Sequence, residues 1–174
     1  MIKRISIIIG SKSDLPQCKD GLEYLSLFIR SGEVILVEFD VASIHRNTED
    51  VLKIVYDLVE NQGVNCLIVG AGMANHLTGT IDAFLRYTMK NDSVLVYGVA
   101  FEGKTPQHLL AAKLSIIEVP GTQVIFDFDN PTFLAACEKM VGGEIPEIKI
   151  GQPRKVEKFY SIEDVLNLVN EPKA

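Results

Sequence analysis

Cysteine is scarce in this sequence: Cys18, Cys66 and Cys137 are the only three in 174 residues, and they are widely separated. They form no CxxC pair and do not cluster with histidine. This distribution favours neither a disulfide framework nor a zinc site, so no metal ligands are predicted. A reducing cytoplasm is therefore the expected location.

Positive charge and long hydrophobic runs are also in short supply. Lys and Arg total 17 against 23 Asp and Glu, which gives a net charge of −6 and argues against general affinity for nucleic acid or an anionic membrane. The N-terminal apolar run, residues 5–9, is too short for a secretory core or a membrane span. We expect a soluble protein that holds any anionic ligand by local contacts.

The chain is long enough to bury one core but too short for two ordinary domains, and 47% of its residues are hydrophobic. Short β-branched runs alternate with longer amphipathic stretches, as in a parallel sheet covered by helices. Right-handed crossovers then predict an α/β fold with a doubly wound sheet. The expected strands are 5–9, 34–41, 66–69, 94–99 and 124–128, and the expected helices are 15–30, 48–62, 74–89, 105–117 and 131–141.

Beyond Gly142 the composition changes. Two glycines and two prolines, Pro146 and Pro153, interrupt a polar segment that leads to a last amphipathic stretch, 162–169. We therefore expect a domain over 1–141 and a C-terminal extension over 142–174 that contains a helix. The simpler interpretation is that this helix packs on its own domain, and the alternative is that it covers a neighbouring subunit.

Ligand-type residues follow the first strand. Ligands of open parallel sheets bind beyond the carboxyl ends of the strands, which is where residues 10–14 (GSKSD) should lie. Their two serine hydroxyls, their carboxylate and the free backbone N–H groups suit a phosphate or a ribose. Serine or aspartate before a helix is equally an ordinary cap. Neither a Walker loop nor a GxGxxG turn is present.

The next two loops also carry such residues. Residues 43–46 (SIHR) set an imidazole, which exchanges protons near pH 7, beside a permanently charged guanidinium, although a histidine at a strand end is often only a surface group. Residues 70–79 (GAGMANHLTG) are mostly small, which suits close approach by a ligand or a close-packed turn. Helix capping alone would not require His45, Arg46 and His76. Together the three loops predict one nucleotide-type active site.

At these residues the chain resembles the N5-carboxyaminoimidazole ribonucleotide mutase and aminoimidazole ribonucleotide carboxylase family of purine biosynthesis. Residues 10–14 are similar to the family's GSxSD loop, 43–46 to its SAHR loop and 70–79 to its GAGGAAHLPG loop, in the same order. A weaker likeness continues to about residue 141, and the extension lies outside it.

The resemblance implies a flavodoxin-like, three-layer domain that usually assembles as a homo-octamer and needs neither metal nor organic cofactor. It implies an isomerase that moves a carboxyl group from N5 to C4 of aminoimidazole ribonucleotide, with His45 as general acid and base. The alternative branch is a lyase-type carboxylase that adds free CO2 at C4. Substrate-binding positions carried over by the resemblance are Ser11, Ser13, Asp14, Ser43, Arg46, Ala71, Gly72, His76 and Leu77.

Departures from the family motif concentrate in the third loop. Met73 replaces a glycine, Asn75 an alanine and Thr78 a proline, which predicts a changed pocket where the migrating carboxylate should bind. Arg46 and His76 favour the mutase branch, whereas Asn75 is more typical of the carboxylases. A nucleotide-binding paralogue without activity, or with another substrate, remains an alternative.

Overall fold

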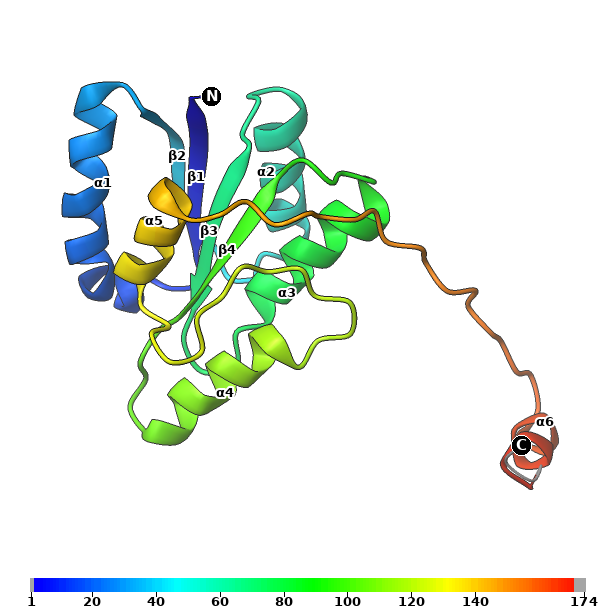
Figure 1. Cartoon of the computed structure of the whole chain (residues 1–174). Coiled ribbons are helices and arrows are strands. Elements are labelled where there is room, and N and C mark those ends of the chain that lie inside the picture. The colour runs from blue at the N-terminus through cyan, green and yellow to red at the C-terminus, as the bar shows by residue number, and fades with distance from the viewer. Residues whose placement is uncertain (1, 171–174) are drawn as a thin grey trace.

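A four-stranded parallel sheet forms the centre of the molecule in the computed structural model, which describes residues 2–170 (Figure 1). The strand order is β2-β1-β3-β4, so the chain first adds strands to one side of β1 and then to the other. This reversal confirms the doubly wound α/β fold. The strands are β1 (Lys3–Ile9), β2 (Val34–Val41), β3 (Cys66–Ala71) and β4 (Leu95–Ala100).

Helices cover both faces of the sheet and complete three layers (Figure 1). One face carries α1 (Lys19–Ser31) and α5 (Phe133–Gly142), which pack against each other. The other face carries α2 (Thr48–Glu60) and α3 (His76–Ala83), and α4 (Pro106–Ile117) lies against α3 and β4.

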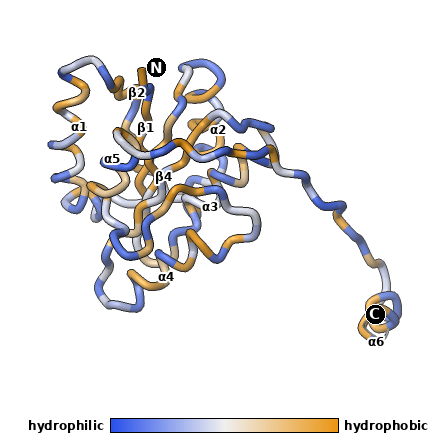
Figure 2. Tube along the Cα trace, in the orientation of Figure 1, coloured by the Kyte–Doolittle hydropathy of each residue, from blue (hydrophilic) through white to orange (hydrophobic). Residues whose placement is uncertain are grey.

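The central strands are apolar on both sides because both faces are covered. Ile5, Ile7 and Ile9 of β1 face α1 and α5, whereas Ile8 points the other way, toward α2. All four side chains are fully buried. Figure 2 shows the result as hydrophobic strands between helices of mixed polarity.

Two of the expected helices have different bounds. A 3₁₀ segment, η1 (Lys12–Cys18), contains Pro16 and precedes α1, because proline lacks the N–H that an α-helical interior requires. The single helix expected over 74–89 is divided into α3 and one π-helical turn, η2 (Phe84–Thr88).

The fifth expected strand, 124–128, is wrong. Only Ile125 pairs with the sheet: its N–H donates to the Val96 carbonyl (2.8 Å), and its own carbonyl accepts from Gly98 N–H (3.0 Å). Asp127 then turns the chain, because its Oδ1 accepts the backbone N–H groups of the second and third residues after it, each at 3.0 Å. Such a side-chain turn competes with the ladder of a strand.

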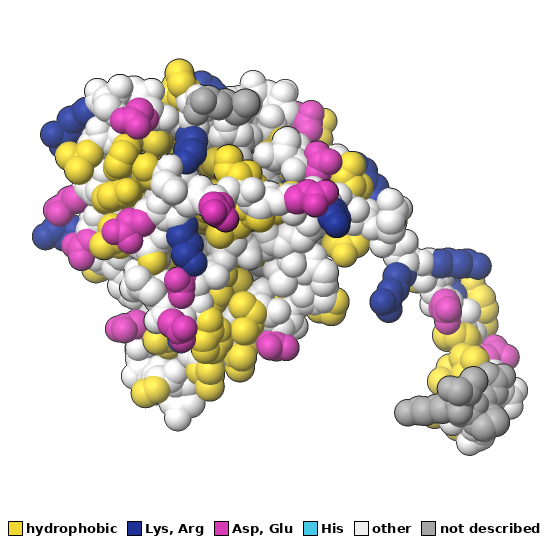
Figure 3. Space-filling view, in the orientation of Figure 1, with side chains coloured by type: hydrophobic (Ala, Val, Ile, Leu, Met, Phe, Trp, Pro, Cys, Tyr) yellow, Lys and Arg dark blue, Asp and Glu magenta, His cyan; other side chains and the backbone are white. Residues whose placement is uncertain are grey.

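Within residues 2–170, the last hydrogen bonds between the C-terminal extension and the body are made at Gly151. The Gln123 side chain exchanges two hydrogen bonds with the backbone of Lys149, both 2.7 Å long, and Gly151 N–H donates to the Arg86 carbonyl (3.2 Å). An irregular strap follows, residues 152–161, which carries a group of Lys and Arg side chains (Figures 1 and 3). Its first three residues still line a surface hollow with Tyr87, Pro120 and Gly121, and the chain then leaves the body.

The helix expected near 162–169 is present as α6 (Ile162–Asn170), but none of its residues is buried. The interpretation that it packs on its own domain is therefore wrong for this chain. Helices α1 to α5 cover most of both faces of the sheet, and Ile35, Leu36 and Val41 of the edge strand β2 remain exposed.

Candidate active site

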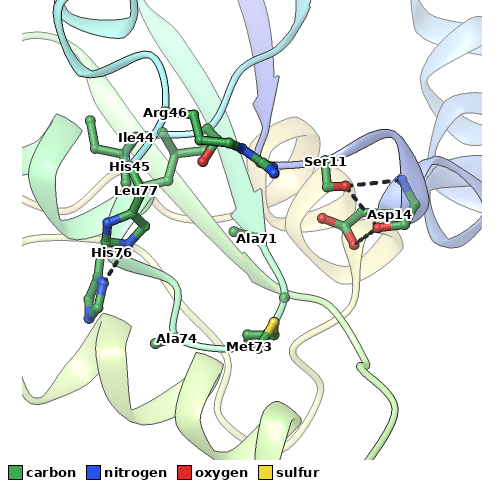
Figure 4. A pocket seen from close by; sticks show the side chains of 14 residues that line it. Ser11, Asp14, Ile44, His45, Arg46, Ala71, Met73, Ala74, His76 and Leu77 are labelled. Carbon is green, nitrogen blue, oxygen red and sulfur yellow. Dashed lines mark hydrogen bonds between the residues drawn. The ribbon is translucent and has the colours of Figure 1, made fainter.

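The loops that follow β1, β2 and β3 enclose a cavity of about 390 Å³ at the carboxyl ends of the strands (Figure 4). Every catalytic or substrate-binding position carried over by the resemblance lines this cavity, although some are 60 residues apart in the chain. The structure therefore brings all of them together. The lining is Gly10, Ser11, Ser13, Asp14, Ser43, Ile44, His45, Arg46, Ala71, Gly72, Met73, Ala74, His76 and Leu77.

The first loop combines capping with a polar pocket wall. Ser11 is the N-cap of η1: its Oγ accepts the Ser13 N–H (3.3 Å) and lies 2.9 Å from the Ser13 hydroxyl. Asp14 is only 6% exposed. Burial raises the pKa of its carboxyl, while hydrogen bonds from the Ser13 hydroxyl and the Gly72 backbone oppose that rise. The capping interpretation is confirmed for Ser11, and the Asp14 carboxylate still lines the cavity.

The second loop is a tight turn that presents two basic side chains. The Ser43 carbonyl accepts the N–H groups of Arg46 (3.1 Å) and Asn47 (2.7 Å), which leaves His45 and Arg46 exposed at the rim. The Arg46 guanidinium extends across the cavity toward Ser11 (Figure 4). No carboxylate of residues 2–170 makes an ion pair with it. Its charge is thus available to an anionic ligand.

A hydrogen bond joins the two histidines of the cavity. His45 Nε2 and His76 Nδ1 are 2.8 Å apart, and the rings meet edge to face at 74° (Figure 4). One nitrogen must donate and the other accept, so each imidazole keeps one ring nitrogen for another partner. The sequence predicts His45 and His76 in one site but does not predict their contact, because no local pattern links positions that are 31 residues apart.

Gly70 and Gly72 of the third loop differ in whether packing requires a glycine. A Cβ on Gly70 would lie 2.7 Å from the Phe101 ring, so packing requires this glycine. A Cβ on Gly72 would meet nothing closer than the Phe101 carbonyl at 3.5 Å. Gly72 is therefore not required by packing, and it lines the cavity beside Asp14, whose carboxylate its backbone contacts.

Of the three departures in this loop, only Met73 lines the cavity. Its side chain is 59% exposed, and its φ of +57° lies in the left-handed region that favours glycine, the residue of the family motif. Asn75 and Thr78 are fully buried beneath the cavity. The expectation that all three would line the carboxylate position is wrong for these two, because their polar groups bond the backbone.

The three cysteines lie in the core rather than at the cavity. All three thiols are buried, and burial raises the pKa of Cys66 to about 11 and that of Cys18 to about 12, so these side chains act as core residues. Within residues 2–170 no three His, Cys, Asp or Glu side chains are arranged to hold a metal ion. In the same range, no helix combines the length and apolarity that a membrane span needs.

Comparison with known proteins identifies related sequences and folds. A family model described as AIR carboxylase matches residues 4–126. The N5-carboxyaminoimidazole ribonucleotide mutase of Thermotoga maritima is 31% identical over 161 residues, which cover 90% of this chain and 82% of that protein. The enzyme of the same name from Vibrio cholerae is 32% identical over 162 residues, which cover 89% of this chain and 88% of that protein. The crystal structure of Treponema denticola PurE has a TM-score of 0.56 at 18% identity and covers 79% of this chain and 80% of that one.

Proposed function

Because the chain belongs to the AIR carboxylase family, we propose that it converts N5-carboxyaminoimidazole ribonucleotide into the C4-carboxylated isomer. The observation that carries this proposal is the convergence of His45, Arg46 and Asp14 on one cavity of about 390 Å³. A proton carrier, an anion-binding cation and a hydroxyl-binding carboxylate are the groups that a carboxylated ribonucleotide requires. The relatives named as mutases match this chain over most of their own length.

Substrate binding is assigned to the three loops. Arg46 and Ser13 hold the 5′-phosphate, which is supported by the absence of an ion-pair partner for Arg46 among the described carboxylates. Asp14 accepts hydrogen bonds from the ribose hydroxyls. Ser11 and the backbone of Ala71 and Gly72 hold the migrating carboxylate, and Ser43, His76 and Leu77 line the place of the base.

His45 acts as general acid and then as general base. It protonates N5 as the bond from N5 to the carbamate carbon breaks, which releases CO2 and aminoimidazole ribonucleotide within the cavity. C4 then attacks the carbon of CO2, and His45 takes the proton that C4 loses. One proton is given and one is taken, so the histidine returns to its initial state. The His76 contact occupies His45 Nε2 and leaves Nδ1 for the substrate.

Turnover of N5-carboxyaminoimidazole ribonucleotide, followed by ultraviolet absorbance, tests the proposal. His45→Asn is expected to lower kcat by at least about 100-fold while the circular dichroism spectrum is unchanged. His108→Asn, which alters the one histidine outside the cavity, is the matched control and should keep full turnover. Full turnover by His45→Asn would show that the acid-base assignment is wrong.

Two other functions have observations in their favour. Asn75 is more typical of the carboxylase branch of the family. Activity only with aminoimidazole ribonucleotide plus bicarbonate would assign the protein to that branch. Met73 in the cavity wall favours a paralogue that binds a nucleotide without turnover. Calorimetry with a phosphoribosyl ligand separates these cases, since tight binding without turnover supports the paralogue and no binding contradicts both functions.

We also propose a homo-octamer in the cytoplasm, with a catalytic domain over 1–141 and an extension over 142–174. The exposed apolar side chains of α6 favour an assembly that covers them, and the three buried free thiols suit a reducing compartment. Light scattering should give eight times the chain mass of 19.2 kDa. A mass equal to one chain would contradict the octamer.

A further inference from the structure

The buried Asn75 side chain bonds two neighbouring backbone segments beneath the cavity. Its Nδ2 donates to the Val99 carbonyl in β4 (2.9 Å), and its Oδ1 accepts the Thr78 N–H in the first turn of α3 (3.1 Å). These backbone partners require opposite ends of the amide, so they fix which way it points. Asn75 therefore connects the start of α3 to the sheet.

Thr78 extends this connection to a second strand. Its hydroxyl lies 3.1 Å from the Val69 carbonyl in β3 and 3.0 Å from Asn75 Oδ1. Asn75 and Thr78 are both fully buried, and neither lines the cavity. Buried polar groups that lose their partners cost free energy, so the network selects one placement of the first turn of α3 over β3 and β4.

His76 is the first residue of α3 and follows Asn75 directly. Its Nδ1 makes the 2.8 Å contact with His45, so the placement of this turn sets that contact. On the other side of Asn75 the loop passes through the left-handed Met73, and the His76 N–H donates to the Ala74 carbonyl of this loop (2.9 Å). The family motif has alanine and proline where this chain has Asn75 and Thr78, so here a hydrogen-bond network takes the place of a rigid proline.

We propose that Asn75 and Thr78 are positioning residues that hold His76 against His45 and thereby orient the His45 ring toward the substrate. The proposal rests on the proposed function, in which His45 carries the proton. A displacement of about 1 Å in a reacting group lowers turnover by as much as about 100-fold. Arg46 and Ser13 bind phosphate from other loops, so kcat should fall while KM changes little.

Four variants test this arrangement. Asn75→Ala is expected to lower kcat by about 10- to 100-fold with KM within about threefold of wild type. Thr78→Val keeps the side-chain shape but removes the hydroxyl, and it should also lower kcat. Thr78→Ser retains the hydroxyl and should keep kcat near the wild-type value. Ser6→Ala removes another fully buried hydroxyl, which bonds the Glu38 carbonyl (2.8 Å) between β1 and β2, and should leave kcat unchanged.

Crystal structures of the same variants supply a measurement that does not depend on the substrate. The distance from His45 Nε2 to His76 Nδ1 should exceed 3.5 Å, the outer limit of a hydrogen bond, in Asn75→Ala and stay near 2.8 Å in Ser6→Ala. An unchanged distance and kcat in Asn75→Ala would overturn the proposal. If that variant does not fold, an unchanged distance and kcat in Thr78→Val would overturn it. A wild type that turns over neither substrate refutes the proposed function, while the distances still test the positioning.

Discussion

Replacing Asp82 by alanine should destabilise the protein more than any exposed charge substitution. Asp82 is 2% exposed and Arg86 is fully buried, and Asp82 Oδ1 accepts a hydrogen bond from Arg86 Nε at 3.0 Å. The other guanidinium nitrogens donate to the carbonyls of Asn91 (2.9 Å) and Val94 (2.8 Å). Burial lowers the pKa of Arg86, and the Asp82 charge opposes that shift. Without Asp82 the buried cation keeps only the weaker influence of the Asp92 charge.

The magnitude follows from two losses. A buried pair that loses one member typically costs about 3–5 kcal/mol, because the remaining charge stays desolvated. Asp82 Oδ2 also accepts the Gln123 N–H (2.8 Å), and the Gln123 side chain holds the backbone of Lys149. We therefore expect Asp82→Ala to lower the free energy of unfolding by about 4 kcal/mol and to loosen the segment before Gly151.

Urea denaturation followed by circular dichroism measures this loss. Glu49→Gln is the matched control, because Glu49 and Lys53 have the same four-residue spacing at 2.7 Å but are exposed. The control should lose less than about 0.5 kcal/mol. Replacing Asp82 by leucine and Arg86 by methionine together should recover much of the stability. A loss in Asp82→Ala no larger than in the control would refute the reasoning.

Three further outcomes are expected. Burial, with a smaller contribution from Glu38, raises the pKa of Asp40 to about 6, and its buried Oδ2 has no hydrogen-bond partner among residues 2–170. The folded state thus binds the Asp40 proton more tightly than the unfolded chain does, so the free energy of unfolding falls as pH rises from about 4 through about 6. In urea titrations Asp40→Asn should flatten this pH profile and raise the free energy of unfolding at pH 8 by on the order of 1 kcal/mol. Met73→Gly should raise the free energy of unfolding by about 1 kcal/mol by removing left-handed strain, and an unchanged urea midpoint would contradict this. Truncation after Gly151 should leave the thermal midpoint of the body unchanged, because residues 152–170 are exposed, and a large drop would reveal contacts made by the strap.

The sheet and the site loops could be predicted because their signals are local. Residues 66–69 are a continuous apolar run and residues 5–9 are apolar except for Ser6, and the loops after them contain polar and charged groups that a hydrophobic core does not need. A parallel sheet brings such loops to one edge whatever the details of packing. That is why every catalytic and substrate-binding position carried over by the resemblance lines one cavity.

The remaining features depend on contacts that one-dimensional patterns do not contain. Residues 124–128 read as a strand, but the Asp127 turn ends the pairing after Ile125. The sequence predicts Asn75 as a pocket residue, but a polar side chain in a loop can point toward solvent or into the core. The inward direction of the Asn75 side chain depends on the carbonyl of Val99, 24 positions away. The amphipathic pattern of α6 shows that a helix has an apolar face without showing what covers it.

The anchor at Gly151 sets how far α6 can act. Residues 152–161, fully extended, span about 33 Å, so α6 samples only a sphere of roughly that radius around a fixed point on the body. Any complementary surface inside this sphere meets α6 at an effective concentration in the millimolar range. A contact with a dissociation constant of about 1 mM, too weak to hold a free peptide, is then occupied about half the time. The tether thus makes α6 an intramolecular ligand for whatever surface the assembly brings within its reach.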